Sequence, residues 1–263
     1  LWLATQGGGL NRLDPRKGTV ERLSKNERDS FGLESDFVKA ILMRRNGDIW
    51  VASQDQGLQL YDRARNRFSK IDIHSKNTKN VEIGSLFEDQ WGLLWVGTHG
   101  DGVFRVHMEN QRLVDVKHYR RTPGNRNGLS YNLVFDVIRP VIMDTNAVWI
   151  ATAFGLNRLD LTTDTIAHFL AGDGLSSDFV LKVLEDAQGN IWCATTEGIS
   201  MYDVRDGHIA SYGTSEGLPF TNFGGSRQNA ARGPDGQLVF SGASGSVGFY
   251  PDQLRRNRHV PPV

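Results

Sequence analysis

Alternation of apolar and polar positions divides much of this chain into short segments of strand length. In its most regular stretch, an apolar run at Phe179–Leu184 is followed by a turn that ends at Gly189, and then by the segments 190–194, 199–203 and 208–212. β-Branched and aromatic residues are frequent in these segments, and turn-forming residues separate them. The pattern predicts four short antiparallel strands within one unit of the chain.

The second strand of this unit recurs along the chain, each time as a Trp flanked by aliphatic residues and followed by small or hydroxyl-bearing ones. A unit of about 45 residues that contains four strands is typical of a β-propeller blade. We therefore predict an all-β protein, a β-propeller of four-stranded antiparallel blades with about six visible repeats. The copies are centred on Trp2, Trp50, Trp95, Trp149 and Trp192, with a degraded sixth copy at Val239.

The first and last repeats are incomplete. The first copy begins at its second strand and the sixth ends just after Phe249, so we expect three strands, then four complete blades, then three strands. The chain opens inside a repeat and without an initiator Met, which we interpret as an excised part of a longer protein. We assign residues 1–252 to the propeller and the basic, Pro-rich residues 253–263 to a linker.

Most residues that recur are expected to be structural. The repeated Trp and the residue two positions later should pack between neighbouring blades, and Cys193 should be a small buried side chain. The Asp that ends the third strand of several copies should cap the following turn. Asn146 replaces a turn glycine and is expected in the left-handed region. Trp91 is expected to pack on its own hairpin, with a partner contact as the alternative.

Charge and cysteine content exclude several kinds of function. Lys and Arg together number 30, as do Asp and Glu, so the net charge is zero and a general nucleic-acid or membrane-surface binder is disfavoured. A single cysteine allows neither an internal disulfide nor a Cys-based zinc site. The sequence also lacks phosphate-loop, zinc-protease and nucleophile-elbow motifs, so we predict no catalytic residues, no metal site and no cofactor.

Candidate binding residues are sought where the copies differ, because structural positions recur around a propeller whereas site residues occur once. The turn after each Trp strand and the loop that enters each blade should lie on one face, around the central channel, and binding residues concentrate on such loops. A solvated loop residue is the alternative at every one of these positions. The candidate ligand-binding residues are Gln54, Asp55, His99, Asp101, Arg126, Tyr131, Phe154, Asp178, Glu197 and Asn222.

The pattern Asp-x-x-Gly-x-Ile-Trp-x-Ala-Thr-x-x-Gly-Leu-x-x-Leu-Asp, preceded by Gly174–Val180, resembles the two-component regulator propeller repeat. Residues Gly242–Asp252 resemble the last propeller repeat of such sensors, and His259–Val263 resemble the entry to the immunoglobulin-like domain that follows it. The resemblance implies that the visible repeats are part of a seven-bladed ring. It also implies a periplasmic domain of an inner-membrane protein that signals to a histidine kinase or a diguanylate cyclase. It further implies a small-molecule or oligosaccharide ligand, a downstream immunoglobulin-like domain as partner, and a homodimer of the longer protein.

Three functions are left open by these observations. The first is a non-catalytic ligand-sensing domain of a signal-transduction protein. The second is a propeller lyase of the streptogramin-inactivating kind, whose repeats look similar. It requires a His and a Glu or Asp that converge at the mouth of the channel, because acid-base catalysis needs hydrogen-bonded contact, and His99, Asp101 and Glu197 are the candidates. The third is a purely structural scaffold for dimerisation.

Overall fold

The computed structural model describes residues 1–26, 29, 31–54, 56–73, 82–110, 112–125, 127–224 and 229–254. Apart from three 3-10 turns, η1 (Ala171–Asp173), η2 (Thr214–Glu216) and η3 (Pro251–Gln253), the regular structure of this part is entirely antiparallel β-sheet. The strands form six sheets, each built from strands that are consecutive in the chain. We number these sheets as blades 1 to 6.

Each blade is a meander whose strands pair in chain order. Blade 1 contains β1 (Trp2–Thr5), β2 (Gly9–Asp14) and β3 (Thr19–Leu23). Blade 2 contains β4 (Val38–Met43), β5 (Ile49–Ser53), β6 (Gly57–Asp62) and β7 (Arg67–Ile71). Blade 3 contains β8 (Ile83–Glu88), β9 (Leu94–Thr98), β10 (Val103–Glu109) and β11 (Arg112–Tyr119). Blade 4 contains β12 (Val134–Ile138), β13 (Ala147–Thr152), β14 (Gly155–Asp160) and β15 (Thr165–Phe169). Blade 5 contains β16 (Val180–Glu185), β17 (Ile191–Thr195), β18 (Ile199–Tyr202) and β19 (Ile209–Tyr212), and blade 6 contains β20 (Asn229–Arg232), β21 (Leu238–Gly242) and β22 (Gly245–Phe249).

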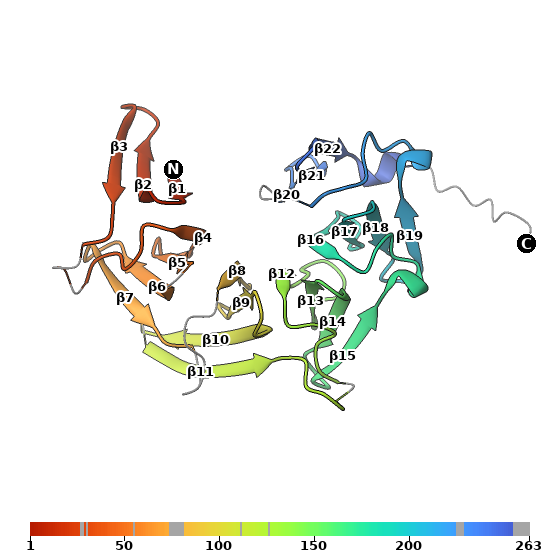
Figure 1. Cartoon of the computed structure of the whole chain (residues 1–263), viewed down its shortest axis with the longest axis horizontal. Helices are drawn as coiled ribbons and strands as arrows, with labels where there is room; N and C mark the ends of the chain where they lie inside the picture. Colours follow the sequence, from red (N-terminus) through yellow and green to blue (C-terminus); the bar gives the residue numbers. More distant parts are fainter. Residues whose placement is uncertain are drawn as a thin grey trace, which may run out of the picture.

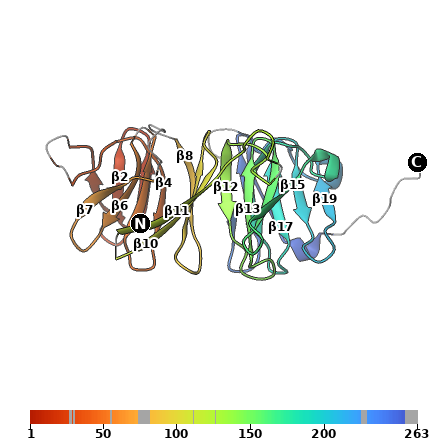
Figure 2. The ribbon, with the colours of Figure 1, turned by 90° about the horizontal axis from the view of Figure 1, so that it is seen from below.

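The six blades are arranged as an open arc, with β4, β8, β12, β16 and β20 nearest its centre and blades 1 and 6 on either side of the opening (Figure 1). Seen from the side, the blades stand next to one another with their strands running between two loop-covered faces (Figure 2). The predicted propeller class and the series of three, four, four, four, four and three strands are confirmed. Blade 1 lacks an inner strand and blade 6 lacks an outer strand.

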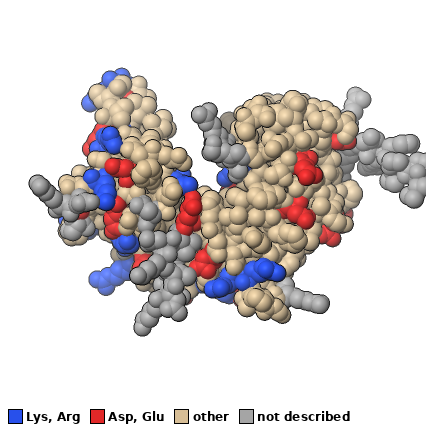
Figure 3. Space-filling model, in the orientation of Figure 1, with Lys and Arg blue, Asp and Glu red and all other residues tan. Residues whose placement is uncertain are grey.

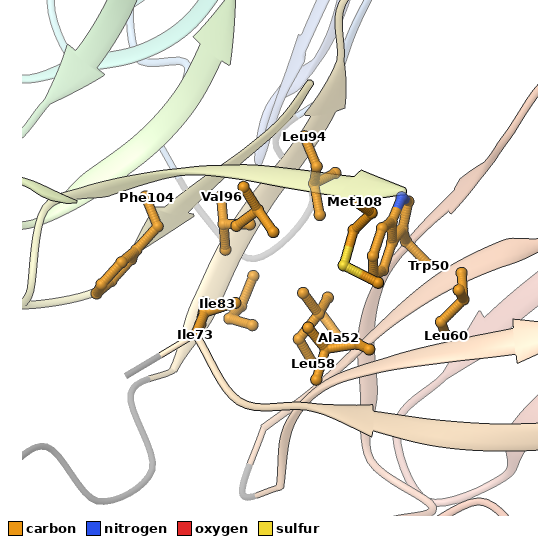
Figure 4. Packing of buried hydrophobic residues seen from close by; sticks show 12 residues of the cluster. Trp50, Ala52, Leu58, Leu60, Ile73, Ile83, Leu94, Val96, Phe104 and Met108 are labelled. Atoms are coloured by element: carbon orange, nitrogen blue, oxygen red, sulfur yellow. The ribbon is translucent and has the colours of Figure 1, made fainter. Parts of the chain in front are cut away.

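The hydrophobic core consists of five clusters, one between each pair of successive blades. Between blades 2 and 3, Trp50 and Ala52 of β5 pack against Leu94 and Val96 of β9 (Figure 4). The other four clusters repeat this arrangement. Burying a Trp side chain of roughly 200 Å² contributes about 5 kcal/mol of gross hydrophobic free energy. The predicted packing of the Trp side chains between blades is therefore confirmed.

Cys193 lies in the cluster between blades 4 and 5, where it is 1% exposed. Burial raises the pKa of its thiol to about 12, so the thiol stays protonated at neutral pH. The prediction of a small buried side chain rather than a nucleophile is confirmed.

The hairpins between third and fourth strands are capped as the sequence predicts. Asp14, Asp62, Asp160 and Asp203 each accept hydrogen bonds from backbone N–H groups two or three residues later. The prediction for Asn146 is wrong, because its φ is not among the positive values of the described residues. The turn that contains it closes directly onto β13 through a bond from Ala147 N–H to Asp144 C=O of 3.0 Å, so it needs no left-handed residue.

Trp91 was expected to pack on its own hairpin, but the contact described for its ring comes from the next blade. The Arg139 guanidinium lies 3.5 Å from the centre of the Trp91 ring. Arg139 also forms an ion pair of 2.8 Å with Asp89, whose side chain is only 1% exposed. Trp91 itself remains 54% exposed. This cluster joins blades 3 and 4 at the face opposite the entry loops.

Candidate ligand-binding face

The turns after the Trp strands and the entry loops do lie on the same face, as predicted. In all four complete blades, a backbone N–H of the turn donates to a carbonyl at the end of the entry loop of the same blade: Gln54 to Phe37, His99 to Glu82, Ala153 to Leu133, and Thr196 to Phe179. Neighbouring blades are linked in the same way, since Gly155 N–H of blade 4 donates to Asp178 C=O of blade 5 at 2.6 Å. The two sets of loops therefore form one connected face.

Buried hydroxyl groups hold this face in place from below. The Thr that ends the Trp strand donates to the carbonyl of the turn glycine, as Thr152 does to Gly155 at 2.9 Å and Thr195 does to Gly198 at 3.1 Å. Both Thr side chains are 0% exposed. Ser176 of the entry loop approaches Thr195 Oγ1 at 3.0 Å, so the entry loop is fastened to the same buried position.

Three titratable side chains meet where the inner strands begin. Lys39, the second residue of β4, places Nζ 2.6 Å from the Glu82 carboxylate, which immediately precedes β8. His99 Nδ1 lies 3.5 Å from the same carboxylate oxygen. The hydrogen bond from Lys39 is the main reason that the pKa of Glu82 is lowered, and the nearby His99 acts in the same direction. All three side chains are between about a quarter and a third exposed.

Two aromatic rings continue this group across the next two blades. Phe135, the second residue of β12, contacts His99 edge to face with ring centres 5.7 Å apart. Phe179, immediately before β16, lies 5.0 Å from Phe135. We call Lys39, Glu82, His99, Phe135 and Phe179 the rim cluster. It crosses blades 2 to 5 at the entry-loop ends of the strands that lie nearest the centre of the arc (Figure 1).

A recurring β-bulge explains why side chains near the start of the inner strands can join the rim cluster. In each of the four complete blades, the pairing of the inner strand shifts just after its first residue, so that one residue has no partner on the Trp strand. A bulge re-aims the side chain of the unpaired residue. The four unpaired residues are Lys39, Gly84, Phe135 and Leu181.

Gly84 differs from the other three bulge residues because it carries no side chain. A Cβ atom at Gly84 would lie 2.4 Å from His99 Nε2. The imidazole of His99 therefore occupies the space that a side chain at the bulge of blade 3 would fill. Because Gly84 has no side chain, His99 can lie in the rim cluster.

A second charged pair lies one residue further along the inner strands. Lys182 Nζ is 3.7 Å from Asp136 Oδ1, and Val183 N–H donates to Asp136 Oδ2 at 3.2 Å. Burial raises the pKa of Asp136, against the opposing effect of Lys182. This pair ties blade 4 to blade 5 beneath the rim cluster.

Of the ten candidate residues, His99 alone belongs to the rim cluster. Asp101 is close in sequence but turns toward the outer strand, where its carboxylate lies 3.5 Å from His118 Nε2 and 3.7 Å from Arg120 Nη1. Asp178 has a loop-building role, because its carboxylate accepts from Ala171 N–H at 2.6 Å. Asp36 and Asn132 make the same type of bond at the entries to blades 2 and 4.

The remaining candidates are spread over the loops or lie outside the described residues. Tyr131 and Phe154 are 45% and 47% exposed and come from the two loops of blade 4. Gln54, Glu197 and Asn222 are exposed on blades 2, 5 and 6. Asp55 and Arg126 are not among the described residues. Sequence reasoning missed Lys39, Glu82, Phe135 and Phe179, although the copies visibly differ at the second residue of the inner strand.

The three residues named for a lyase do not converge in the described part of the chain. No hydrogen bond or ion pair there joins His99, Asp101 and Glu197, since His99 contacts Glu82 and Asp101 contacts His118 and Arg120. The described residues also contain no group of three or more His, Cys, Asp or Glu side chains that could hold a metal ion. None of the described helices is long and apolar enough to cross a membrane. On the face drawn in Figure 3, Lys and Arg are interspersed with Asp and Glu, with no extended patch of one sign.

Comparison with known proteins points to one family of repeats. The family model described as two component regulator propeller matches residues 78–100 and 174–197. A curated relative, Histidine kinase P4 of Formosa agariphila, is 22% identical over 317 residues, which cover all of this chain and 22% of the relative. The chain therefore spans about a fifth of the length of that protein.

Two solved structures share the fold. The extracellular domain of a putative hybrid two-component system from B. thetaiotaomicron is 21% identical, with a TM-score of 0.56 over 99% of this chain and 39% of that one. PorZ, a surface component of the type-IX secretion system of Porphyromonas gingivalis, is 18% identical, with a TM-score of 0.70 over 94% of this chain and 36% of that one. Residues 78–100 and 174–197 thus match the two-component regulator propeller repeat, and the six blades share the propeller fold of these solved structures.

Proposed function

We propose that this propeller is a non-catalytic, extracytoplasmic ligand-sensing domain of a membrane-bound bacterial signal-transduction protein with a histidine kinase or diguanylate cyclase output. The proposal is supported by the matched repeats and by the histidine kinase among its relatives. It is also supported by the partly exposed rim cluster on the entry-loop face. The longer protein would be anchored in the inner membrane, with the propeller in the periplasm.

The rim cluster is the observation that carries the ligand-binding proposal. It places a cation, a carboxylate and an imidazole next to two aromatic rings, on side chains from four successive blades. Such a set offers both donors and acceptors beside an apolar ring face, and ligand sites combine a few placed polar groups with apolar walls in this way. A small polyhydroxylated molecule, such as an oligosaccharide, fits these groups. The exposed Tyr131 and Phe154 would extend the contact surface on blade 4.

Calorimetric titration of the purified domain with a panel of oligosaccharides and small periplasmic solutes tests this proposal. We expect one ligand class to bind, and His99→Ala and Phe135→Ala each to weaken that binding about tenfold or more. Glu197→Ala, on an exposed turn of blade 5, serves as the matched control and should leave affinity unchanged. If the His99 and Phe135 variants bind the ligand as tightly as the unaltered protein, or if only the Glu197 variant loses binding, the rim cluster is not the site.

The remaining parts of the proposal concern the longer protein. We propose that an immunoglobulin-like domain follows the propeller, that further chain completes a seven-bladed ring, and that the longer protein is a homodimer. Sedimentation of a longer ectodomain, with and without the ligand found by titration, checks the dimer. A dimer that forms without any ligand response would favour the purely structural scaffold instead.

A further inference from the structure

The hairpin between the first two strands of blade 4 is longer than its counterparts. In blades 2, 3, 5 and 6, five residues separate the inner strand from the Trp strand, whereas the eight residues 139–146 separate β12 from β13. The tip of this longer hairpin carries Val141, Ile142 and Met143, which are 54%, 41% and 40% exposed. Three consecutive large apolar side chains therefore face solvent.

A single carboxylate of the next blade holds the backbone of this tip. Glu185, the last residue of β16, accepts hydrogen bonds from the N–H groups of Val141, Ile142 and Met143 at 2.8, 2.9 and 3.4 Å. The Met143 side chain lies against Gly189, in the space that a Cβ atom at Gly189 would fill. The tip is therefore an ordered loop, and three of its backbone donors are satisfied without water.

The two charged residues of the same hairpin are paired and buried. Arg139 forms its ion pair of 2.8 Å with Asp89, and Asp144 forms one of 2.6 Å with Arg158. The side chains of Arg139 and Asp144 are each only 9% exposed. The hairpin therefore presents an apolar tip to solvent without an exposed charge of its own.

Trp91 extends this apolar surface onto blade 3. The hairpins that follow β8 and β12 lie next to each other on one face of the molecule (Figure 2). The Trp91 ring is 54% exposed and contacts Arg139, two residues before Val141. We call Trp91, Val141, Ile142 and Met143 the hairpin patch. Its side chains together expose on the order of 400 Å², and exposed apolar patches of this size are often functional.

The size and composition of the hairpin patch favour a lipid surface over a protein as its partner. A stable protein interface buries about 800 Å² on each partner and contains roughly one hydrogen bond per 100–200 Å². The patch has about half that area. An uncharged aliphatic tip with a Trp beside it is instead typical of segments that enter the boundary between lipid headgroups and acyl chains.

The polar groups around the patch also fit a lipid surface. Backbone donors that enter an apolar layer must be satisfied within the protein, and the bonds to Glu185 satisfy those of the tip. Arg45 of blade 2 is exposed and donates to the Gln90 carbonyl, next to Trp91, at 3.5 Å. A cation therefore lies beside the patch, where a lipid phosphate can pair with it.

We propose that the hairpin patch inserts into the surface of a lipid bilayer, with residues 141–143 at the level of the first acyl carbons and Trp91 among the headgroups. Insertion of this kind depends on apolar contact, so it agrees with the zero net charge of the chain. It turns the face opposite the entry loops toward the membrane and leaves the rim cluster open to solutes on the other side. The inference does not depend on ligand sensing by the rim cluster.

Flotation of the purified chain with vesicles of phosphatidylethanolamine and phosphatidylglycerol tests the inference. The chain should float with the vesicles, and Val141→Ser combined with Ile142→Ser should lower its partition coefficient about tenfold or more. Leu113→Ser combined with Val114→Ser, on β11, is the matched control, because these side chains are likewise 41% and 54% exposed. The control should bind vesicles like the unaltered chain. Since all four side chains are exposed, circular dichroism should show that both double variants fold.

Tryptophan fluorescence provides a second readout of the same contact. Emission should shift to shorter wavelength when vesicles are added, brominated lipid should quench it, and Trp91→Phe should remove both changes. The proposal is overturned if the chain does not float, if the two double variants bind equally well, or if Trp91→Phe leaves the fluorescence change intact. Loss of binding in concentrated NaCl would also overturn it, because apolar insertion is not screened by salt. A dimer of the unaltered chain that the Val141 and Ile142 variant dissociates would make a second copy the occupant instead.

Discussion

The carboxylate of Asp186 accepts a hydrogen bond of 2.8 Å from the indole nitrogen of Trp192. The same carboxylate accepts from the backbone N–H groups of Gln188 and Asn190, and it is 0% exposed. Asp89 and Trp95 repeat this contact in blade 3 at 3.2 Å. The turn before the Trp strand and the core between blades are therefore held by one side chain.

Replacing Asp186 by Ala should destabilise the domain by about 2–4 kcal/mol, because several buried donors lose their acceptor at once. Urea unfolding followed by circular dichroism measures this change. Asp235→Ala is the matched control, since Asp235 holds the equivalent turn of blade 6 at the surface. A loss as large for Asp235→Ala as for Asp186→Ala would contradict the account.

The Trp of blade 2 offers a second comparison. Arg44 stands where blades 3 and 5 carry the Asp, and the buried Nε1 of Trp50 has no acceptor among the described residues. Trp50→Phe should therefore cost about 1–2 kcal/mol less than Trp192→Phe, because only the second substitution breaks a hydrogen bond. Both side chains are at most 2% exposed, so the lost packing is similar. Equal losses of unfolding free energy for the two variants would refute this prediction.

The ion pair between Arg139 and Asp89 should matter more for stability than pairs at the surface. Arg139→Met leaves the Asp89 carboxylate buried without its cation and should cost about 3–5 kcal/mol. Arg12→Met, which removes a pair with Glu21 whose side chains are nearly half exposed, should cost less than about 1 kcal/mol. Thermal unfolding of the two variants under the same conditions tests the difference, and similar melting temperatures would rule it out.

Substitution of Gly84 tests the geometry of the rim cluster without touching its side chains. The Cβ of Gly84→Ala would overlap the tip of the His99 ring, which must move, while the backbone at this position needs no left-handed conformation. We expect ligand binding to fall about as much as in His99→Ala, with little change in melting temperature. Imidazole resonances in NMR spectra report the displacement of His99. Unchanged resonances would show that the ring does not occupy the bulge space.

The Lys39–Glu82 pair should give the rim cluster a dependence on acidity. The pKa of Glu82 is lowered from its usual 4.5 chiefly by the Lys39 hydrogen bond, so the pair contributes stability above that value. This contribution is lost as the pH falls through the lower pKa of the folded state. Because both side chains are partly exposed, Lys39→Met should cost less than about 1 kcal/mol at pH 7. The difference should disappear in acid, once the pH is below the lowered pKa of Glu82. A difference that persists in acid would point to lost packing instead.

The fold could be predicted from the sequence because it depends on features that every copy repeats. A Trp strand every 45 or so residues, with turn residues on either side, leaves few architectures open. The prediction is wrong where the spacing between the turn Asp and the Trp differs in one copy. Asp144 is one residue closer to Trp149 than Asp186 is to Trp192, so the turn around Asn146 closes differently.

Less of the candidate site could be predicted from the sequence, because the site is formed by contacts between blades. His99 was identified, but its partners Glu82, Phe135 and Phe179 come from strand ends of three blades, far apart in the chain. The bulge that re-aims Lys39 and Phe135 leaves no pattern in a single copy. The bond from Ala171 N–H to the Asp178 carboxylate could not be predicted, because it spans an entry loop and a lone polar loop residue does not reveal such a partner.

The five separate core clusters have a mechanical consequence. Since each blade packs only on its two neighbours, the arc is a one-dimensional series of units whose stabilities add through nearest-neighbour interfaces. In the described part of the chain, blades 1 and 6 each have one such interface. A ligand seated on the rim cluster touches four units of the series at once. Binding there would couple four blades that otherwise contact only their neighbours. The bound arc would therefore resist bending as one unit.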